Sequence, residues 1–226
     1  MARYKALVFD LDGTLLDTIA DLGEAVNYAL EKRGFPPHTL AEYRGMVGNG
    51  VRKLVERALP QMPGPGGQGD SRHSTACPWN LLDECLADFM AYYESHIDVH
   101  TAPYAGMPEL LEELSSAGVA LAVASNKFQS GAEYLVRKLF PGIPFVAILG
   151  NREGFPLKPD PAIVETVLKQ AGVAKADAAL IGDSATDMKT AANAGIPGIA
   201  VAWGYQDMTG YPVVAGSVEQ LRTILS

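Results

Sequence analysis

Short apolar runs that alternate with helical patterns constrain the fold of this chain more than any other feature. Each run lacks the regular polar positions of a half-exposed strand, which is typical of parallel strands buried on both faces. The segments between the later runs carry apolar residues at helical spacing, and two of them end just before Gly118 or Gly172. The runs are residues 6–9, 119–124, 145–149, 178–181 and 198–202.

Strands that alternate with helices predict an α/β protein with a doubly wound parallel sheet. In such a sheet the carboxyl ends of the strands share one edge, and ligands bind beyond that edge. Polar residues that directly follow the strands are therefore the first candidates for a functional site.

The segment from residue 16 to residue 100 breaks this pattern, because it is helical without strands. We expect an all-α domain over residues 16–100, inserted into an α/β core made of residues 1–15 and 101–226. Residues 61–80 are rich in glycine, proline and serine, which predicts a mobile loop. The inserted helices are expected around residues 22–30, after the capping-box pattern of residues 39–42, and around residues 51–59 and 81–90.

Charge and cysteine content exclude several classes of protein. The net charge is −8, whereas a nucleic-acid surface or an anionic membrane surface needs clustered lysine and arginine. Cys77 and Cys85 are the only cysteines, which is too few for a disulfide framework and fits a reducing cytosol. No apolar stretch approaches the length of a membrane span, so we expect a cytoplasmic protein. The oligomeric state is not predicted.

The strongest chemical signal is a pair of aspartates, Asp10 and Asp12, directly after the first apolar run. Gly13 allows a sharp turn, so that neighbouring N–H groups can face the same site. Two close carboxylates repel each other and would repel a phosphate, and they coexist at low cost only with a divalent cation between them. An acidic turn that caps a helix is the alternative interpretation.

A second aspartate pair, Asp183 and Asp187, follows the run of residues 178–181. The two residues are four apart, so one helical turn could place both on the same side. Carboxylate oxygens suit Mg²⁺. A helix cap made by Asp183 or Ser184 is the alternative, and both interpretations can hold together.

Two single residues complete the pattern. Ser125 follows the run of residues 119–124, and its hydroxyl could bind a phosphate oxygen or cap a helix. Lys158 precedes Pro159 and Pro161, and it could serve as a point charge for phosphate or lie solvated at the surface. Strands of the predicted sheet thus deliver Asp, Ser, Lys and Asp, in chain order, to the edge where ligands bind.

These residues resemble the four motifs of the haloacid dehalogenase superfamily of phosphotransferases. The motifs map onto residues 10–14, Ser125, Lys158 and residues 182–187, and the resemblance covers essentially the whole chain, including a helical cap between the first two motifs. It implies a Rossmann-like core and Mg²⁺ as the cofactor. Asp12 implies phosphoryl transfer from an oxygen ester, because dehalogenases and phosphonate-cleaving members lack an acid there.

The resemblance also implies a role for each site residue. In catalysis, Asp10 is the nucleophile that forms an aspartyl phosphate, Asp12 is the general acid and base, and Lys158 stabilises the phosphate. Mg²⁺ is held by Asp10, the backbone carbonyl of Asp12 and Asp183, with Asp187 orienting its waters. Substrate contacts are implied for Thr14, Ser125 and Asn126 at the phosphate, and for Asn49 in the cap loop, where a plain interhelix turn is the alternative.

Within the superfamily, four stretches resemble the phosphoglycolate phosphatases. This resemblance implies a small phosphorylated metabolite as substrate, with 2-phosphoglycolate first. Two alternatives remain open: a sugar-phosphate mutase, similar to β-phosphoglucomutase, that shields its aspartyl phosphate from water, and a non-catalytic binding protein on the same fold. The four stretches are residues 17–22, 47–52, 195–197 and 203–205.

Overall fold

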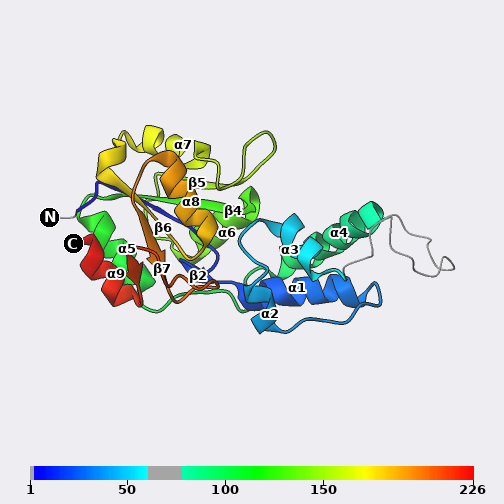
Figure 1. Cartoon of the computed structure of the whole chain (residues 1–226). Coiled ribbons are helices and arrows are strands. Elements are labelled where there is room, and N and C mark those ends of the chain that lie inside the picture. Colours follow the sequence, from blue (N-terminus) through cyan, green and yellow to red (C-terminus); the bar gives the residue numbers. More distant parts are fainter. Residues whose placement is uncertain (1–2, 61–77) are drawn as a thin grey trace.

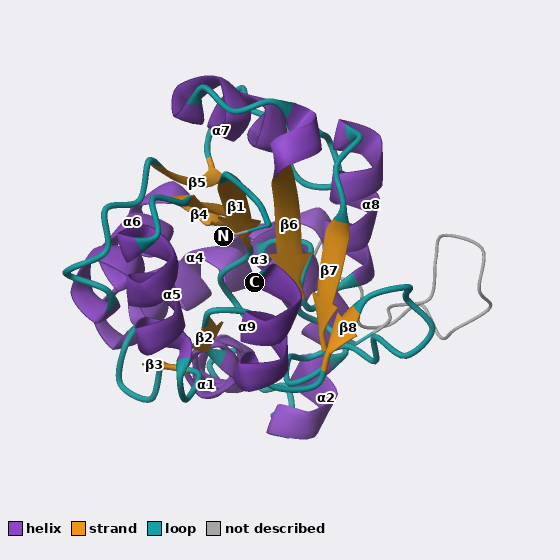
Figure 2. Ribbon diagram, turned by 90° about the vertical axis from the view of Figure 1, so that its left-hand side faces the viewer, coloured by secondary structure: helices purple, strands orange, loops and turns teal. Residues whose placement is uncertain are grey.

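The computed structural model describes residues 3–60 and 78–226. At its centre lies a parallel sheet with the strand order β5–β4–β1–β6–β7–β8 (Figure 2). The first strand of the chain therefore lies in the interior of the sheet, with later strands added on both sides. The strands are β1 (Ala6–Phe9), β4 (Ala120–Phe128), β5 (Ala147–Asn151), β6 (Ala178–Gly182), β7 (Gly198–Val201) and β8 (Val214–Ala215).

Helices cover both faces of the sheet. One face is covered by α5 (Met107–Ser116), α6 (Gln129–Leu139) and α9 (Val218–Leu225), and the other by α7 (Ala162–Ala171) and α8 (Ala185–Ala194), with a short 3₁₀ turn at Lys175–Asp177 (Figure 2). Alternate side chains of β1 separate the faces: Leu7 and Phe9 join the core with the first set, whereas Ala6 and Val8 pack with the second. This arrangement confirms the predicted doubly wound α/β fold.

Strand boundaries differ from the apolar runs where polar residues are buried. β4 continues beyond Ala124 to Phe128, because Ser125, Asn126 and Lys127 are buried and the strand pairs again with β5 after a shift in register. An apolar run cannot reveal such an extension. β5 also begins two residues later than the run that predicted it, and β8 was not predicted because it has only two residues.

The predicted inserted helices are present and lie together beside the sheet (Figure 1). The capping box is confirmed, since the hydroxyl of Thr39 accepts the N–H of Glu42 and the carboxylate of Glu42 accepts the N–H of Thr39. Leu22 and Phe89 join the same apolar core as one face of the sheet. In the described residues these helices are α1 (Ile19–Glu31), α2 (Leu40–Arg44), α3 (Val51–Ala58) and α4 (Pro78–His96).

Two short strands join the segments that lead into and out of these helices. β2 (Leu16–Asp17) pairs antiparallel with β3 (Ala102–Pro103). The prediction that residues 16–100 contain no strand is therefore wrong at its first two residues. A two-residue strand is too short to produce a periodic pattern, and its pairing partner lies more than eighty residues away in the chain.

Asp21, in the first turn of α1, fixes the two linking segments to each other. Its buried carboxylate accepts the backbone N–H groups of His100 and Thr101 at 2.9 Å each, and the hydroxyl of Thr101 at 2.7 Å. The expected division between core and cap lies beside these contacts, and it stays a prediction.

The predicted mobile loop of residues 61–80 lies mostly outside the described residues. Its last three residues are an exception, because they begin α4 instead of continuing a loop. Proline is favoured in the first turn of a helix, so Pro78 marks a helix start and not an irregular segment. None of the described helices is both long and apolar enough to cross a membrane.

Candidate active site

Asp10 lies at the carboxyl end of β1, within the sheet. Its backbone N–H donates to the carbonyl of Ile181 at 2.9 Å, and its buried carboxylate accepts the N–H of Leu11 at 2.7 Å. The chain then turns at Gly13, which has a φ of 85°. A Cβ at Gly13 would lie 2.3 Å from Oδ2 of Asp183, so only glycine lets this turn approach the second acidic motif.

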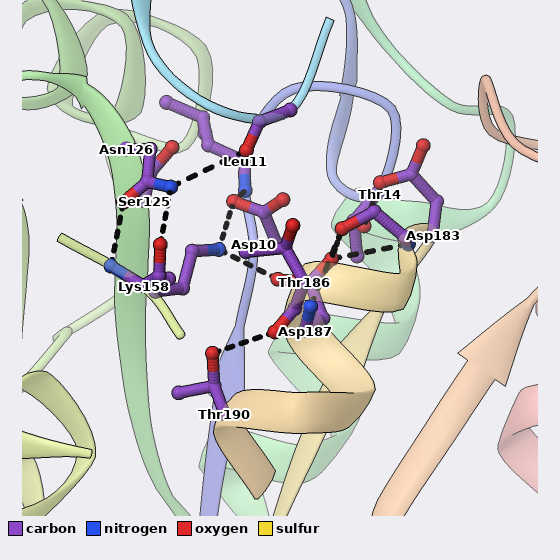
Figure 3. Close-up of polar contacts among 12 residues, drawn as sticks. Asp10, Leu11, Thr14, Ser125, Asn126, Lys158, Asp183, Thr186, Asp187 and Thr190 are labelled. Atoms are coloured by element: carbon purple, nitrogen blue, oxygen red, sulfur yellow. Dashed lines mark hydrogen bonds and ion pairs between the residues drawn. The ribbon is translucent and has the colours of Figure 1, made fainter. Parts of the chain in front are cut away.

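Asp183 follows β6 and faces the same site (Figure 3). Its Oδ2 accepts the backbone N–H of Tyr205 at 2.8 Å, and its Oδ1 accepts the hydroxyl of Thr14 at 3.3 Å. Asp187 lies in the first turn of α8, where Ser184 is the N-cap and the two residues form a capping box. The helix cap and the acidic cluster therefore occur together, as the sequence pattern allowed.

Lys158 lies between two of these carboxylates (Figure 3). Its Nζ is 2.9 Å from Oδ1 of Asp10 and 2.6 Å from Oδ1 of Asp187, and its side chain is only 2% exposed. Asn126 holds the lysine backbone, accepting the N–H of Lys158 at 2.9 Å and donating to its carbonyl at 3.1 Å. Lys158 comes from the loop between β5 and α7, so the prediction that a strand end delivers it is wrong. The surface alternative is wrong as well, because Lys158 is buried.

The buried carboxylates of this site carry more negative charge than Lys158 alone can balance. Burial, aided by the nearby carboxylate of Asp187, raises the pKa of Asp10 to about 7. Burial and the carboxylates of Asp10 and Asp187 raise the pKa of Asp183 to about 8. Burial lowers the pKa of Lys158, but Asp10 and Asp187 outweigh it and raise that pKa above its ordinary value. One buried ammonium thus faces three buried carboxylates.

These residues fit a divalent metal ion. Oxygens from Asp10, Asp183 and Asp187 all lie within 4.8 Å of one another, and carboxylates are hard ligands of the kind Mg²⁺ takes. A Cβ at Gly204 would lie 2.2 Å from Cβ of Asp183, so the wall behind this carboxylate has no room for a side chain. Both oxygens of Asp187 bind Lys158 or Ser184, whereas the contacts of Asp10 with Lys158 and Leu11 are both made by Oδ1, so Oδ2 of Asp10 is better placed for direct contact with a metal ion.

A cavity of about 30 Å³ is lined by Asp10 and lies between the sheet and the inserted helices. The carboxylate of Asp12 lies here, outside the group of three aspartates, with its Oδ1 3.0 Å from Nζ of Lys127. The sheet contributes Asp10, Asp12, Ser125, Asn126 and Lys127 to the lining, and the inserted helices and their loops contribute Leu22, Val47, Gly48, Gly50, Val51 and Leu54.

Ser125 and Asn126 lie where the sequence predicts, but with different surroundings. Ser125 is inside β4 and lines the cavity, so the helix-cap alternative is wrong for this residue. The amide of Asn126 binds both backbone groups of Lys158 and also donates to the carbonyl of Gly48 at 3.3 Å. Asn126 thus joins the lysine loop to the loop before α3, and its contact with substrate stays a prediction.

Thr14 and Asn49 are turned away from the cavity. The hydroxyl of Thr14 is fully buried and contacts Asp183. The amide of Asn49 donates to the hydroxyl of Thr186 in α8 at 3.0 Å and accepts a hydrogen bond from Arg57 at 2.6 Å. The neighbouring glycines line the cavity while Asn49 contacts the core, so its role as a substrate contact remains a prediction that no contact here supports.

Sequence reasoning assigned no role to three residues that contact the site. Lys127 directly follows Ser125 and Asn126 in the sequence, and nothing in the pattern distinguishes it from a surface lysine. Tyr93 lies on the buried face of α4 and contacts Lys127, and nothing in its helical pattern distinguishes it from a core residue. The hydroxyl of Tyr205 accepts the N–H of Thr18 at 2.7 Å, so this residue joins the Asp183 loop to the segment that enters α1.

The fold and the site define a class of protein. A parallel sheet that presents a buried aspartate, a buried lysine and a metal-suited acidic cluster at its carboxyl edge, under inserted helices, is typical of an α/β enzyme for anionic substrates. The chain belongs to the haloacid dehalogenase-like hydrolase family, which matches residues 7–201. This confirms the resemblance drawn from the four motifs.

Individual relatives agree with this assignment. The chain is 34% identical to a phosphoglycolate phosphatase of Agrobacterium fabrum, over 89% of this chain and 82% of the relative. It is 35% identical to one of Pseudomonas putida, over 98% of this chain and 78% of the relative. A solved structure from Lactobacillus delbrueckii subsp. bulgaricus, predicted to be a phosphoglycolate phosphatase, superposes with a TM-score of 0.88 at 33% identity and covers 99% and 98% of the two chains. The chain is therefore an enzyme of the phosphatase kind.

Proposed function

We propose that this protein is a Mg²⁺-dependent phosphatase that hydrolyses a small phosphate monoester, with 2-phosphoglycolate as the leading substrate, through an aspartyl phosphate on Asp10. The names of the relatives support the substrate, and the cluster of Asp10, Asp183 and Lys158 supports the chemistry. We propose that the site residues have the roles that the sequence predicts and that residues 16–100 form the cap. We also propose that the enzyme is cytoplasmic, in keeping with a metabolite substrate.

In the proposed mechanism, a carboxylate oxygen of Asp10 attacks phosphorus in line with the leaving oxygen. The bond from Asp10 to phosphorus forms as the ester bond breaks, and Asp12 donates its proton to the leaving oxygen. Asp12 then accepts a proton from a water molecule that attacks the aspartyl phosphate, which releases inorganic phosphate and regenerates Asp10. Both aspartates line the same cavity, which supports this pairing of roles.

Other residues stabilise charge during these steps. Asp10, Asp183 and the backbone carbonyl of Asp12 would hold the Mg²⁺ ion, with Asp187 behind them. When bound, the ion neutralises the repulsion between the carboxylate of Asp10 and the phosphate. Lys158 and Ser125 stabilise the phosphate oxygens.

The observation that carries the substrate class is the lining of the cavity beside Asp10. Within the described residues, the cap contributes only aliphatic side chains and glycines to this lining, among them Leu22, Val51 and Gly50. A sugar ring would need polar side chains to bind its several hydroxyls, since buried polar groups need hydrogen-bond partners, whereas backbone N–H groups of the glycine-rich loop in this lining, at Gly48 and Gly50, would suffice for the single carboxylate of glycolate. This lining favours a leaving group with few hydroxyls over a sugar phosphate.

The test is phosphate release from a panel that contains 2-phosphoglycolate, other small phosphate esters and sugar phosphates. We expect the highest kcat/KM for 2-phosphoglycolate, by about tenfold or more over sugar phosphates, because each misfit polar group in such a site costs about 1–3 kcal/mol. EDTA is expected to abolish turnover and added Mg²⁺ to restore it. Isomerisation of glucose 1-phosphate without phosphate release would contradict the proposal and favour a mutase.

A further inference from the structure

Lys127 is a second buried lysine of this site, and the proposed mechanism gives it no role. Its side chain is 1% exposed, so its charge is removed from water almost completely. Its Nζ is 3.0 Å from Oδ1 of Asp12 and 2.7 Å from the hydroxyl of Tyr93. The lysine comes from β4 of the sheet, Asp12 from the turn after β1, and Tyr93 from α4 of the inserted helices.

A buried ammonium group is costly unless charged and polar partners surround it. For Lys127 those partners are the carboxylate of Asp12 and the phenol of Tyr93, whose ring centroid is also 4.9 Å from Nζ. The two contacts fix where the ammonium lies, and the ammonium in turn fixes one oxygen of Asp12. The side chain of Asp12 is itself 14% exposed, so it has water-accessible space to turn into if this contact is lost.

We propose that Lys127 is a positioning residue for proton transfer: it holds one oxygen of Asp12 so that the other oxygen faces the leaving group, and Tyr93 joins this arrangement to the cap. The inference rests on the proposed function, because that function assigns the proton transfer to Asp12. Lys127 acts through Asp12 and not on the phosphate, because the proposed mechanism assigns the phosphate to Lys158, whose Nζ is 2.9 Å from Oδ1 of Asp10.

The contact with Tyr93 crosses from the core to the inserted helices. The ring of Tyr93 is fully buried. Its centroid lies 5.0 Å from the ring centroid of Phe89 in the same helix and 6.1 Å from that of Phe128 at the end of β4. When the cap lies against the sheet in this way, both partners of Lys127 are present. A displacement of α4 would remove one of them and loosen the orientation of Asp12.

The test uses two phosphate esters whose leaving groups differ in how much they need protonation by a general acid. An alkyl phosphate has a poor leaving group that must be protonated, whereas p-nitrophenyl phosphate has a good leaving group that departs without much assistance. For Lys127→Met we expect kcat/KM to fall about 100-fold on the best alkyl ester of the panel and less than about 5-fold on p-nitrophenyl phosphate. The parameter kcat/KM reports the steps up to release of the leaving group, so the later proton transfer from water does not obscure the comparison.

Tyr93→Phe removes a single oxygen and keeps the inference testable if the lysine variant does not fold. We expect this variant to lose about 10-fold in kcat/KM on the alkyl ester and little on the aryl ester. Tyr92→Phe is the matched control, because it removes a hydroxyl from the adjacent residue of α4, where the ring stacks on Tyr28 and His96. The control is expected to retain full activity on both esters.

Equal losses on the two esters for Lys127→Met or Tyr93→Phe would overturn the inference, because they would indicate a structural role or a direct contact with phosphate. Asp12→Asn separates this failure from failure of the proposed function. If Asp12→Asn lowers kcat/KM more on the alkyl ester than on the aryl ester and Lys127→Met does not, only the positioning role of Lys127 is contradicted. If Asp12→Asn lowers kcat/KM equally on both esters, Asp12 is not the general acid, and the proposed mechanism fails.

Discussion

Asp10→Asn is expected to abolish phosphatase activity while leaving the fold intact, with a loss of at least about 10⁴-fold in kcat. The substitution removes the nucleophilic oxygen but keeps the size of the side chain and an oxygen that can accept the N–H of Leu11. Steady-state kinetics on the best substrate measure the loss, and circular dichroism reports the fold. Substantial retained turnover would contradict the proposed role of Asp10.

The same variant has an expected effect on stability, because Asp10 is buried beside other carboxylates. Its pKa is raised from 3.8 to about 7, so between these values the folded state binds more protons than the unfolded state. Its contribution to stability therefore decreases as the pH rises through this range. In EDTA, Asp10→Asn is expected to raise Tm at pH 8 by about 2–4 °C, the shift that about 1 kcal/mol produces in a protein of this size, and to change it little near pH 4.

A lower Tm for Asp10→Asn at pH 8 in EDTA would mean that the ion pair with Lys158 outweighs the repulsion. Added Mg²⁺ provides a second comparison. The ion is expected to stabilise the native protein more than the variant, because binding to the folded state alone contributes RT ln(1 + [L]/Kd) and the variant lacks one carboxylate ligand.

Lys158→Met is expected to affect stability as well as activity. The substitution leaves Asp10 and Asp187 buried without their cation, and breaking a buried ion pair costs about 3–5 kcal/mol. For a protein of this size that lowers Tm by about 6–20 °C. Loss of a preorganised cation at the phosphate should also lower kcat by about 10²–10³-fold. Thermal melts in EDTA and steady-state kinetics provide the two measurements.

A double variant tests whether the unpaired carboxylate causes this loss of stability. Asp187→Asn added to Lys158→Met removes a buried charge, and the Asn side chain can still accept the hydrogen bonds of Ser184. The double variant is therefore expected to be more stable than Lys158→Met alone. Lys175→Met is a suitable control for loss of a lysine, because its ion pair with Glu165 is half exposed and contributes little. Additive destabilisation by the two substitutions would contradict this explanation.

The parts of the site that follow directly from strand ends could be predicted from the sequence. Asp10 and Asp183 follow apolar runs that are strands in the structure, and parallel strands bring their carboxyl ends to one edge. Lys158 was also predicted as a candidate residue, but its place was wrong, because it lies in the loop after β5 and not at a strand end.

The contacts between distant polar residues could not be predicted in the same way. Lys127 and Asp12 are 115 residues apart, and their ion pair depends on how β4 and the turn after β1 meet in space. Asn49 illustrates the opposite case: its loop lines the cavity as expected, but its side chain forms its hydrogen bonds with Arg57 and Thr186. A sequence pattern locates a loop, whereas the direction of each side chain depends on packing.

The most direct test of the central claim is chemical trapping of the aspartyl phosphate on Asp10. In Asp12→Asn, p-nitrophenyl phosphate should still phosphorylate the enzyme, while the loss of the general base slows hydrolysis of the intermediate, so the aspartyl phosphate accumulates. Borohydride added during turnover reduces an acyl phosphate to an alcohol, which converts the modified aspartate to homoserine. Peptide mass spectrometry is expected to find homoserine at position 10 and nowhere else. Trapping at another residue, or no trapping in a variant that still turns over substrate, would contradict the account.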